Sequence, residues 1–261
     1  MIKHDFKRIF SGYSVAVSSV LIVVIMLLTT VEQQYMQNSI FNIVLDVSDR
    51  AEFLLIFAVA AVPYVGSFVD DFEHKTVYQC IIRCDMRKYV FSRTISIFAS
   101  SLITVALGVV GYAILLRGMG RPWISDDIIK SYELNGFGFP DLELWFLIED
   151  GYSIIFYIIA GVQFGMLAGI ISLCTALLSL FINNKMMTMV APVIILYIIN
   201  CYLGGIFGYG DVSVGYLFNA FFNYTFWGDH FFVRCVSTSL FSYAVFSLMI
   251  YYRVRRRIRY E

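Results

Sequence analysis

Residues 70–77 read DDFEHKTV, and they stand between two long apolar stretches of the chain. This charged segment, residues 70–93, contains five Lys or Arg side chains before the next apolar stretch begins. It is too polar to enter the hydrocarbon core of a bilayer and too short to form a domain. We therefore expect it to lie on the cytosolic surface of a membrane, where another protein can push on it.

The rest of the chain has the composition of an integral membrane protein. Of its 261 residues, 59% are hydrophobic and only 15% are charged. Charge-free stretches of about 17 residues or more can cross a bilayer, and each must be a helix because lipid cannot satisfy backbone polar groups. The sequence predicts an all-α membrane protein in which residues 1–261 form one transmembrane domain. The six expected spans are 11–31, 53–69, 94–116, 151–181, 186–208 and 235–252.

The charge distribution favours six spans over seven, although the aromatic segment 212–228 is apolar enough to be counted. With six, 14 of the 19 Lys and Arg residues fall on the cytosolic side, and 13 of the 19 Asp and Glu residues fall outside. Lys and Arg prefer the cytoplasmic side of a membrane. We therefore expect a multi-pass protein of the cell membrane with both termini in the cytosol. Its external loops would be 32–52, 117–150 and 209–234.

Within segment 70–93, apolar side chains recur at helical spacing. Four of them are three, one and three residues apart, namely Val77, Cys80, Ile81 and Cys84. This spacing predicts a short amphipathic helix parallel to the membrane. Its cations, Arg83, Arg87 and Lys88, would then form a docking surface in the cytosol. A solvated basic loop is the alternative interpretation.

These residues resemble a motif of the permease subunits of type-2 ABC exporters, which pair with a separate ATPase. In that family an acidic residue and a Thr follow the second span, and an apolar stretch, an Arg, an aromatic residue and a small-plus-basic pair come next. The matching residues here are Glu73, Thr76, Val77, Ile81, Ile82, Arg87, Tyr89, Ser92 and Arg93. The chain departs from the pattern at Lys75, where the family commonly has Gly.

The resemblance implies a transport subunit that is not itself an enzyme. Six spans form half of a transport path in the family, so a second permease copy would complete it, as a homodimer or in a heterodimer. Spans one and five would form the dimer seam, spans two and five would line the path, and 209–234 would be a re-entrant external segment. Two copies of the ATPase would bind the segment 70–93. The implied coupling residues are Asp71, Glu73, Thr76, Arg83, Arg87 and Arg93.

Cofactor sites are not expected in this chain. It contains no Gly-x4-Gly-Lys-Ser/Thr loop to hold nucleotide phosphates, so ATP and Mg would bind to the partner ATPase. The three histidines, His4, His74 and His230, fall in separate segments and predict no metal site. A formal net charge of zero gives no indication of a nucleic-acid partner. The basic segment 253–259 is expected to bind lipid headgroups, with ATPase docking as the alternative.

Two sets of residues inside the expected spans are of interest. Glycines recur every four residues in 151–181, at Gly161, Gly165 and Gly169. Such a stripe lets another helix approach closely, and packing within the chain is a simpler explanation than a substrate path. In 186–208, Pro192 should kink the helix. Tyr197 and Asn200 then share a stripe and are candidate path-lining residues, although Asn200 could equally form a core hydrogen bond.

Other function classes fit the sequence less well. The six expected spans contain no Asp, Glu, Lys, Arg or His. Ion-coupled carriers and channels rely on ionisable groups inside the membrane, as do membrane enzymes. A non-transporting scaffold or sensor subunit stays open. For an exporter, the small external loops and abundant Phe and Tyr residues favour an amphipathic or hydrophobic cargo such as a peptide.

Overall fold

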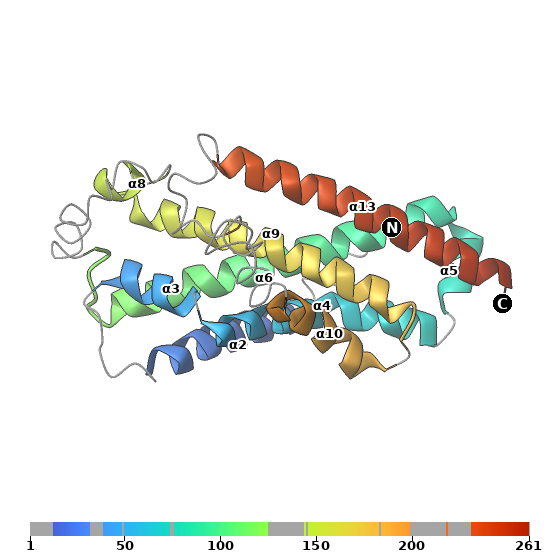
Figure 1. The fold of residues 1–261 in the computed structure, drawn as a ribbon, viewed down its shortest axis with the longest axis horizontal. Coiled ribbons are helices and arrows are strands. Elements are labelled where there is room, and N and C mark those ends of the chain that lie inside the picture. The colour runs from blue at the N-terminus through green and yellow to red at the C-terminus, as the bar shows by residue number, and fades with distance from the viewer. Residues whose placement is uncertain are drawn as a thin grey trace.

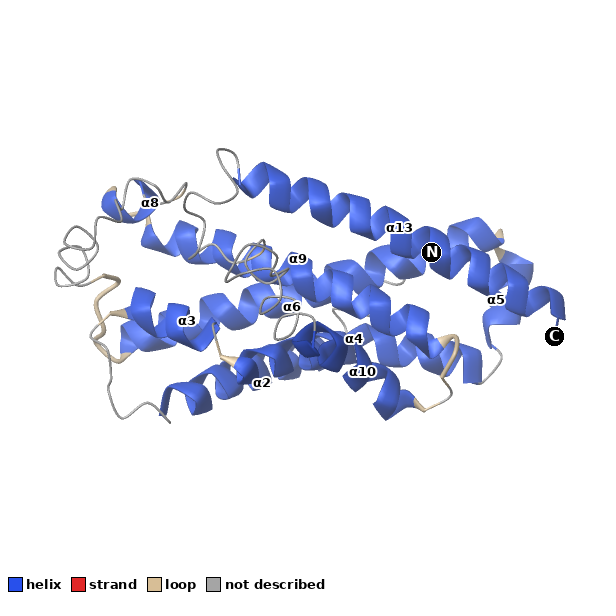
Figure 2. Ribbon diagram, viewed as in Figure 1, coloured by secondary structure: helices blue, strands red, loops and turns tan. Residues whose placement is uncertain are grey.

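The computed structural model describes residues 13–31, 39–48, 50–73, 76–124, 144, 146–182, 184–198, 218 and 231–260. Throughout this part of the chain the secondary structure is helical and contains no strand. The long helices run roughly along one axis and form an elongated bundle (Figures 1 and 2). The expected all-α fold class is therefore confirmed for the described residues.

Among the described residues, four helices are long and apolar enough to cross a membrane. They are α4 (Leu54–Glu73), α6 (Met86–Gly118), α9 (Ser153–Ser179) and α13 (Phe231–Tyr260). These helices indicate a membrane-embedded protein, and they overlap the expected spans 53–69, 94–116, 151–181 and 235–252. At the expected first and fifth spans lie two shorter apolar helices, α2 (Ser14–Val31) and α10 (Lys185–Ile198). The count of six spans stays a prediction.

Two of the long helices extend into the charged segment 70–93. α4 continues to Glu73, and α6 begins at Met86, eight residues before the expected span 94–116. A short helix, α5 (Thr76–Arg83), lies between them. The expected spans ended at the first charge because lipid excludes charges, whereas a charge that is paired inside a bundle does not face lipid.

The central pair of helices is α6 and α9, which pack closely because of glycines. A Cβ atom added at Gly165 would lie 2.6 Å from the backbone oxygen of Leu102, and one at Gly161 would lie 3.2 Å from backbone atoms of Ala106. At Gly169 the added atom would meet the ring of Phe98 at 2.5 Å. All three glycines therefore face α6 of the same chain.

Small polar side chains hold the other helices against α6. The hydroxyl oxygen of Ser101 lies within hydrogen-bond distance of the backbone oxygen of Ala60 in α4, at 3.0 Å, and of the hydroxyl of Ser172 in α9, at 2.7 Å. Ser19 of α2 donates to the backbone oxygen of Thr104 at 3.1 Å. Hydrogen bonds of this kind stabilise helix association where water is absent. α6 thus lies at the centre of the described bundle.

The expected external loop 32–52 contains a helix, α3 (Ile40–Ser48), followed by the 3-10 turn η1 (Ala51–Phe53). The apolar face of α3 is buried in the core, and it consists of Ile40, Phe41, Ile43, Val44 and Val47. The amides of Ile40 and Phe41 donate to the carbonyls of Pro122 and Trp123 at 3.0 and 3.2 Å. α3 therefore joins the two expected external loops.

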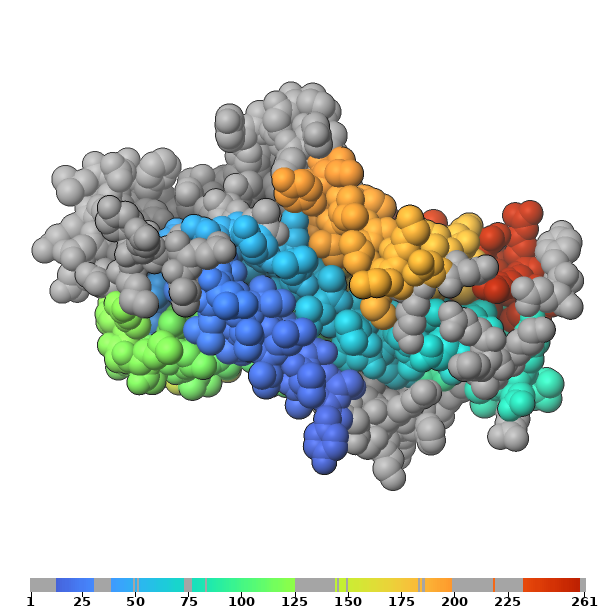
Figure 3. Space-filling view, turned by 90° about the horizontal axis from the view of Figure 1, so that it is seen from below, coloured from blue at the N-terminus to red at the C-terminus, as the bar shows by residue number. Residues whose placement is uncertain are grey.

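The two ends of the bundle differ. α3 and the short helix α8 (Phe146–Glu149) lie at one end, and α5 lies at the other together with the C-terminal end of α13 (Figure 1). On one face of the molecule α2 and α10 lie on either side of α4 (Figure 3). Of the expected external segment 209–234, only 218 and 231–234 are among the described residues.

Candidate functional site

The candidate site is the α5 end of the bundle, where α5 follows α4 and precedes α6 within segment 70–93. The amide of Cys84 donates to the carbonyl of Cys80 at 2.9 Å, which closes the last turn of α5. The amide of Tyr89 donates to the carbonyl of Asp85 at 3.0 Å, which opens α6. Only residues 84 and 85 separate α5 from α6, so a movement of α5 must act on α6.

α5 has one face on the bundle and one face open. Val77 is 1% exposed and belongs to an apolar cluster formed by α4, α6, α9 and α13. Cys80 and Ile81 are half-buried against the same cluster. Ile82 is 86% exposed, on the opposite side. Three of the four residues that the helical spacing groups on one face, Val77, Cys80 and Ile81, therefore hold α5 to the bundle.

A buried ion pair joins the neighbouring ends of α4 and α6. Nη2 of Arg93 donates to Oδ2 of Asp71 at 2.5 Å, and the two side chains are only 5% and 12% exposed. Arg93 also donates a hydrogen bond to the hydroxyl of Tyr64. The hydroxyl of Tyr89 donates to Asp71 at 3.5 Å. The carboxylate and the guanidinium thus neutralise each other out of contact with water.

Two aromatic rings complete this network. The guanidinium carbon of Arg93 lies 5.6 Å from the ring centroid of Tyr64 and 5.5 Å from that of Tyr89. Tyr64 and Asp71 are seven residues apart on α4, and Tyr89 and Arg93 are four apart on α6, so each pair shares one helix face. A buried charge is stable only when it is paired and hydrogen-bonded, and here both conditions are met.

The other expected coupling residues lie at the adjoining ends of α4, α5 and α6. Arg87 is exposed in the first turn of α6, beside the exposed Lys88. Glu73 ends α4, and Thr76 and Arg83 begin and end α5, while the side chains of these three lie outside the described part of the structure. Asp71 and Arg93 are buried, so they cannot contact a partner directly. Their role in coupling would be to hold α4 and α6 together.

The basic end of α13 packs onto the same end of the bundle. Ile250 and Val254 are fully buried in the cluster that also contains Val77. The guanidinium of Arg253 lies 4.1 Å from the ring centroid of Phe181, and that of Arg257 lies 5.5 Å from the ring of Phe72. The basic segment 253–259 therefore packs onto the α5 end of the bundle, in addition to any contact that it makes with lipid headgroups.

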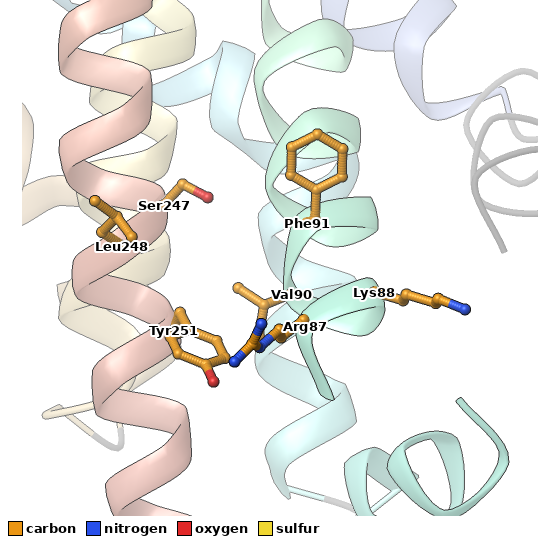
Figure 4. Close-up of a pocket in the computed structure, with 7 residues that line it drawn as sticks. All are labelled: Arg87, Lys88, Val90, Phe91, Ser247, Leu248 and Tyr251. Atoms are coloured by element: carbon orange, nitrogen blue, oxygen red, sulfur yellow. The ribbon is translucent and has the colours of Figure 1, made fainter. Parts of the chain in front are cut away.

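A groove opens at the α5 end of the bundle, between the first turns of α6 and the middle of α13 (Figure 4). Its volume is ≈ 490 Å³. At its inner side the hydroxyl of Thr94 lies 3.1 Å from that of Tyr243 and 3.3 Å from that of Ser247. These contacts tie α13 to α6 close to the groove.

The described structure covers only one of the two candidate path-lining residues. Tyr197 is 46% exposed near the end of α10, which ends at Ile198. Asn200 lies outside the described residues. Gln163 in α9 was not expected from the sequence, yet it is fully buried and neither of its amide atoms has a hydrogen-bond partner among the described residues. A polar residue within the apolar stretch 151–181 was the available signal.

Comparisons with known proteins add no relative to this picture. No protein-family model, no curated protein and no solved structure matches the chain. The resemblance to type-2 ABC permeases therefore rests on the sequence itself, chiefly on the residues of segment 70–93.

Proposed function

We propose that this chain is the permease subunit of an ATP-driven exporter and that segment 70–93 couples it to a separate ATPase. The chain would cross the cell membrane six times with both termini in the cytosol. ATP and Mg would be bound by the ATPase, and the cargo would be an amphipathic or hydrophobic molecule, with a peptide favoured.

The observation that carries this proposal is the attachment of α5. Its inner face is anchored by Val77, and the two helices that flank it are joined by the Asp71–Arg93 ion pair. A solvated loop would absorb a push by changing its own conformation. An anchored helix between two paired helices instead passes a displacement to both of them, because packed interiors are dense and transmit strain.

The positions of α2 and α10 support a dimeric assembly. These helices occupy the expected first and fifth spans, which would form the dimer seam, and they lie on one face on either side of α4 (Figure 3). Their outward side chains are apolar, including the exposed Val17, Val20, Leu28, Ile194 and Ile195. We propose that a second copy of the chain covers this face and that lipid surrounds the rest.

An ion-coupled carrier is the rival function, and the ion pair bears on it. A carrier needs an ionisable group that changes its charge or its partner during transport. Asp71 is paired with Arg93 and accepts a hydrogen bond from Tyr89, which is the arrangement of a structural pair. A scaffold subunit would leave α5 without an ATPase to bind.

The test uses variants in α5 and in the first turn of α6. Ile82→Asp changes an exposed residue of α5, and the double variant Arg83→Glu/Arg87→Glu reverses two of the expected docking charges. We expect both to reach the membrane folded but to co-purify with less of an ATPase that carries the Gly-x4-Gly-Lys-Ser/Thr loop, and to lose export in cells. Truncating a buried partner of such a contact costs ~2–5 kcal/mol.

The matched control is Arg117→Glu, an exposed cation at the far end of α6. It should leave both ATPase recovery and export unchanged. Normal recovery and normal export for the α5 variants would overturn segment 70–93 as the coupling element. Loss of export with normal ATPase recovery would equally contradict docking at this surface.

A further inference from the structure

The groove between α6 and α13 has a cationic end and an apolar end. Arg87 and Lys88 stand at the cationic end, and Figure 4 shows the guanidinium of Arg87 directed toward the ring of Tyr251 across the groove, with Lys88 extending outward from α6. One turn further along lie Phe91 and Leu248, which are 52% and 56% exposed. Cations therefore meet an open apolar surface where α6 enters its apolar stretch.

The cations of the groove are not neutralised within the described chain. Arg93, two turns into α6, is paired with Asp71, whereas Arg87 and Lys88 form no ion pair with any described residue. The nearest acidic residue in sequence is Asp85, which is exposed and makes no side-chain hydrogen bond to the α6 terminus. On α13, the exposed Arg255 lies four residues beyond Tyr251 and so on the same face. The surroundings are therefore net positive.

The expected position of the groove in the membrane indicates which molecule would occupy it. The groove lies between α6 and α13, which are both long and apolar enough to cross a membrane, and Tyr side chains favour the boundary between headgroups and hydrocarbon. A soluble anion would leave the apolar walls uncovered. A molecule with a negative headgroup and an acyl chain covers both parts of the groove.

We propose that this groove binds an anionic phospholipid of the membrane leaflet at the α5 end of the bundle. Its phosphate-bearing headgroup would contact Arg87 and Lys88, and one acyl chain would lie against Phe91 and Leu248. The backbone amides in the first turn of α6 also favour a negative charge at this position. The lipid would bridge α6 and α13 next to the Thr94 contacts, and this role does not depend on the proposed export function.

The experiment compares two phospholipids on the purified full chain. Native mass spectrometry counts phosphatidylglycerol and phosphatidylcholine molecules that stay bound after detergent exchange. Each Lys or Arg near an anionic lipid surface contributes about a fivefold factor in binding. We therefore expect Arg87→Gln/Lys88→Gln to lose up to about thirtyfold in its preference for phosphatidylglycerol. Leu248→Trp, which keeps both cations and fills the apolar end, should reduce binding of both lipids at this site.

The control, Arg117→Gln/Arg234→Gln, removes the same charge from exposed cations at the opposite ends of α6 and α13. It should keep the wild-type preference. An equal loss in the control, or wild-type binding in the groove variants, would overturn the proposal. Unchanged lipid binding together with reduced ATPase recovery for Arg87→Gln/Lys88→Gln would assign this face to the ATPase instead.

Discussion

Replacing either partner of the Asp71–Arg93 pair should lower the stability of the protein, because the charge that remains is buried and has lost this partner. Replacing Arg93 by Met removes from the carboxylate of Asp71, which is 12% exposed, its ion-pair contact at 2.5 Å. Replacing Asp71 by Asn removes the carboxylate that lies 2.5 Å from a guanidinium that is only 5% exposed. Removing one partner of a buried ion pair typically lowers the free energy of unfolding by about 3–5 kcal/mol.

The double variant Asp71→Asn/Arg93→Met contains no buried charge at this position. Its loss of stability should therefore be smaller than the sum of the two single losses, by about 2–3 kcal/mol. The assay is a double-mutant cycle in which denaturant unfolding in detergent is monitored by tryptophan fluorescence. Lys88→Met is the matched control, because it removes an exposed cation from the same helix and should change stability by less than about 0.5 kcal/mol. Losses that add within about 0.5 kcal/mol would refute the pairing of the two side chains.

Two other predictions concern helix packing and topology. Gly165→Ala should lower the thermal stability of the protein in detergent, because the added Cβ would lie 2.6 Å from the backbone oxygen of Leu102. The control Gly111→Ala should not lower it, because the nearest neighbour of that Cβ is a Val23 methyl at 3.5 Å. Equal melting temperatures would show that α9 does not depend on this close approach. In a background without native cysteines, Met119→Cys should react with an impermeant reagent from outside the cell and Gln79→Cys only from inside, because both sites are exposed at opposite ends of the bundle. Labelling of Gln79→Cys from outside would contradict the expected orientation.

Much of the helical framework follows from the sequence, because lipid excludes charges and unpaired backbone groups. The apolar stretches accordingly coincide with α4, α6, α9 and α13. The inner face of α5 also follows, since Val77 and Ile81 lie four residues apart on it. Local spacing predicts these features because each depends on one helix at a time.

Other features depend on contacts that spacing along the chain does not contain. Asp71 and Arg93 are 22 residues apart with α5 between them, so the sequence indicates two surface charges and not a buried pair. Their pairing is what lets α4 and α6 continue into a charged segment. α3 differs from the expected loop for another reason, because the acidic residues of 32–52 indicate an external loop while its apolar residues from Ile40 to Val47 have helical spacing.

The position of α6 explains how a movement at α5 could be felt at the other end of the molecule. α6 has 33 residues and is therefore about 50 Å long. It is held to α4 by the ion pair of Arg93 and to α9 along the glycine stripe, so it resists bending over much of its length. Directly after its far end, the carbonyls of Pro122 and Trp123 hold the first turn of α3. A displacement of α5 would thus tilt α6 as one body and move the anchor of α3, which makes the α3 end the place where coupling would change access to the bundle.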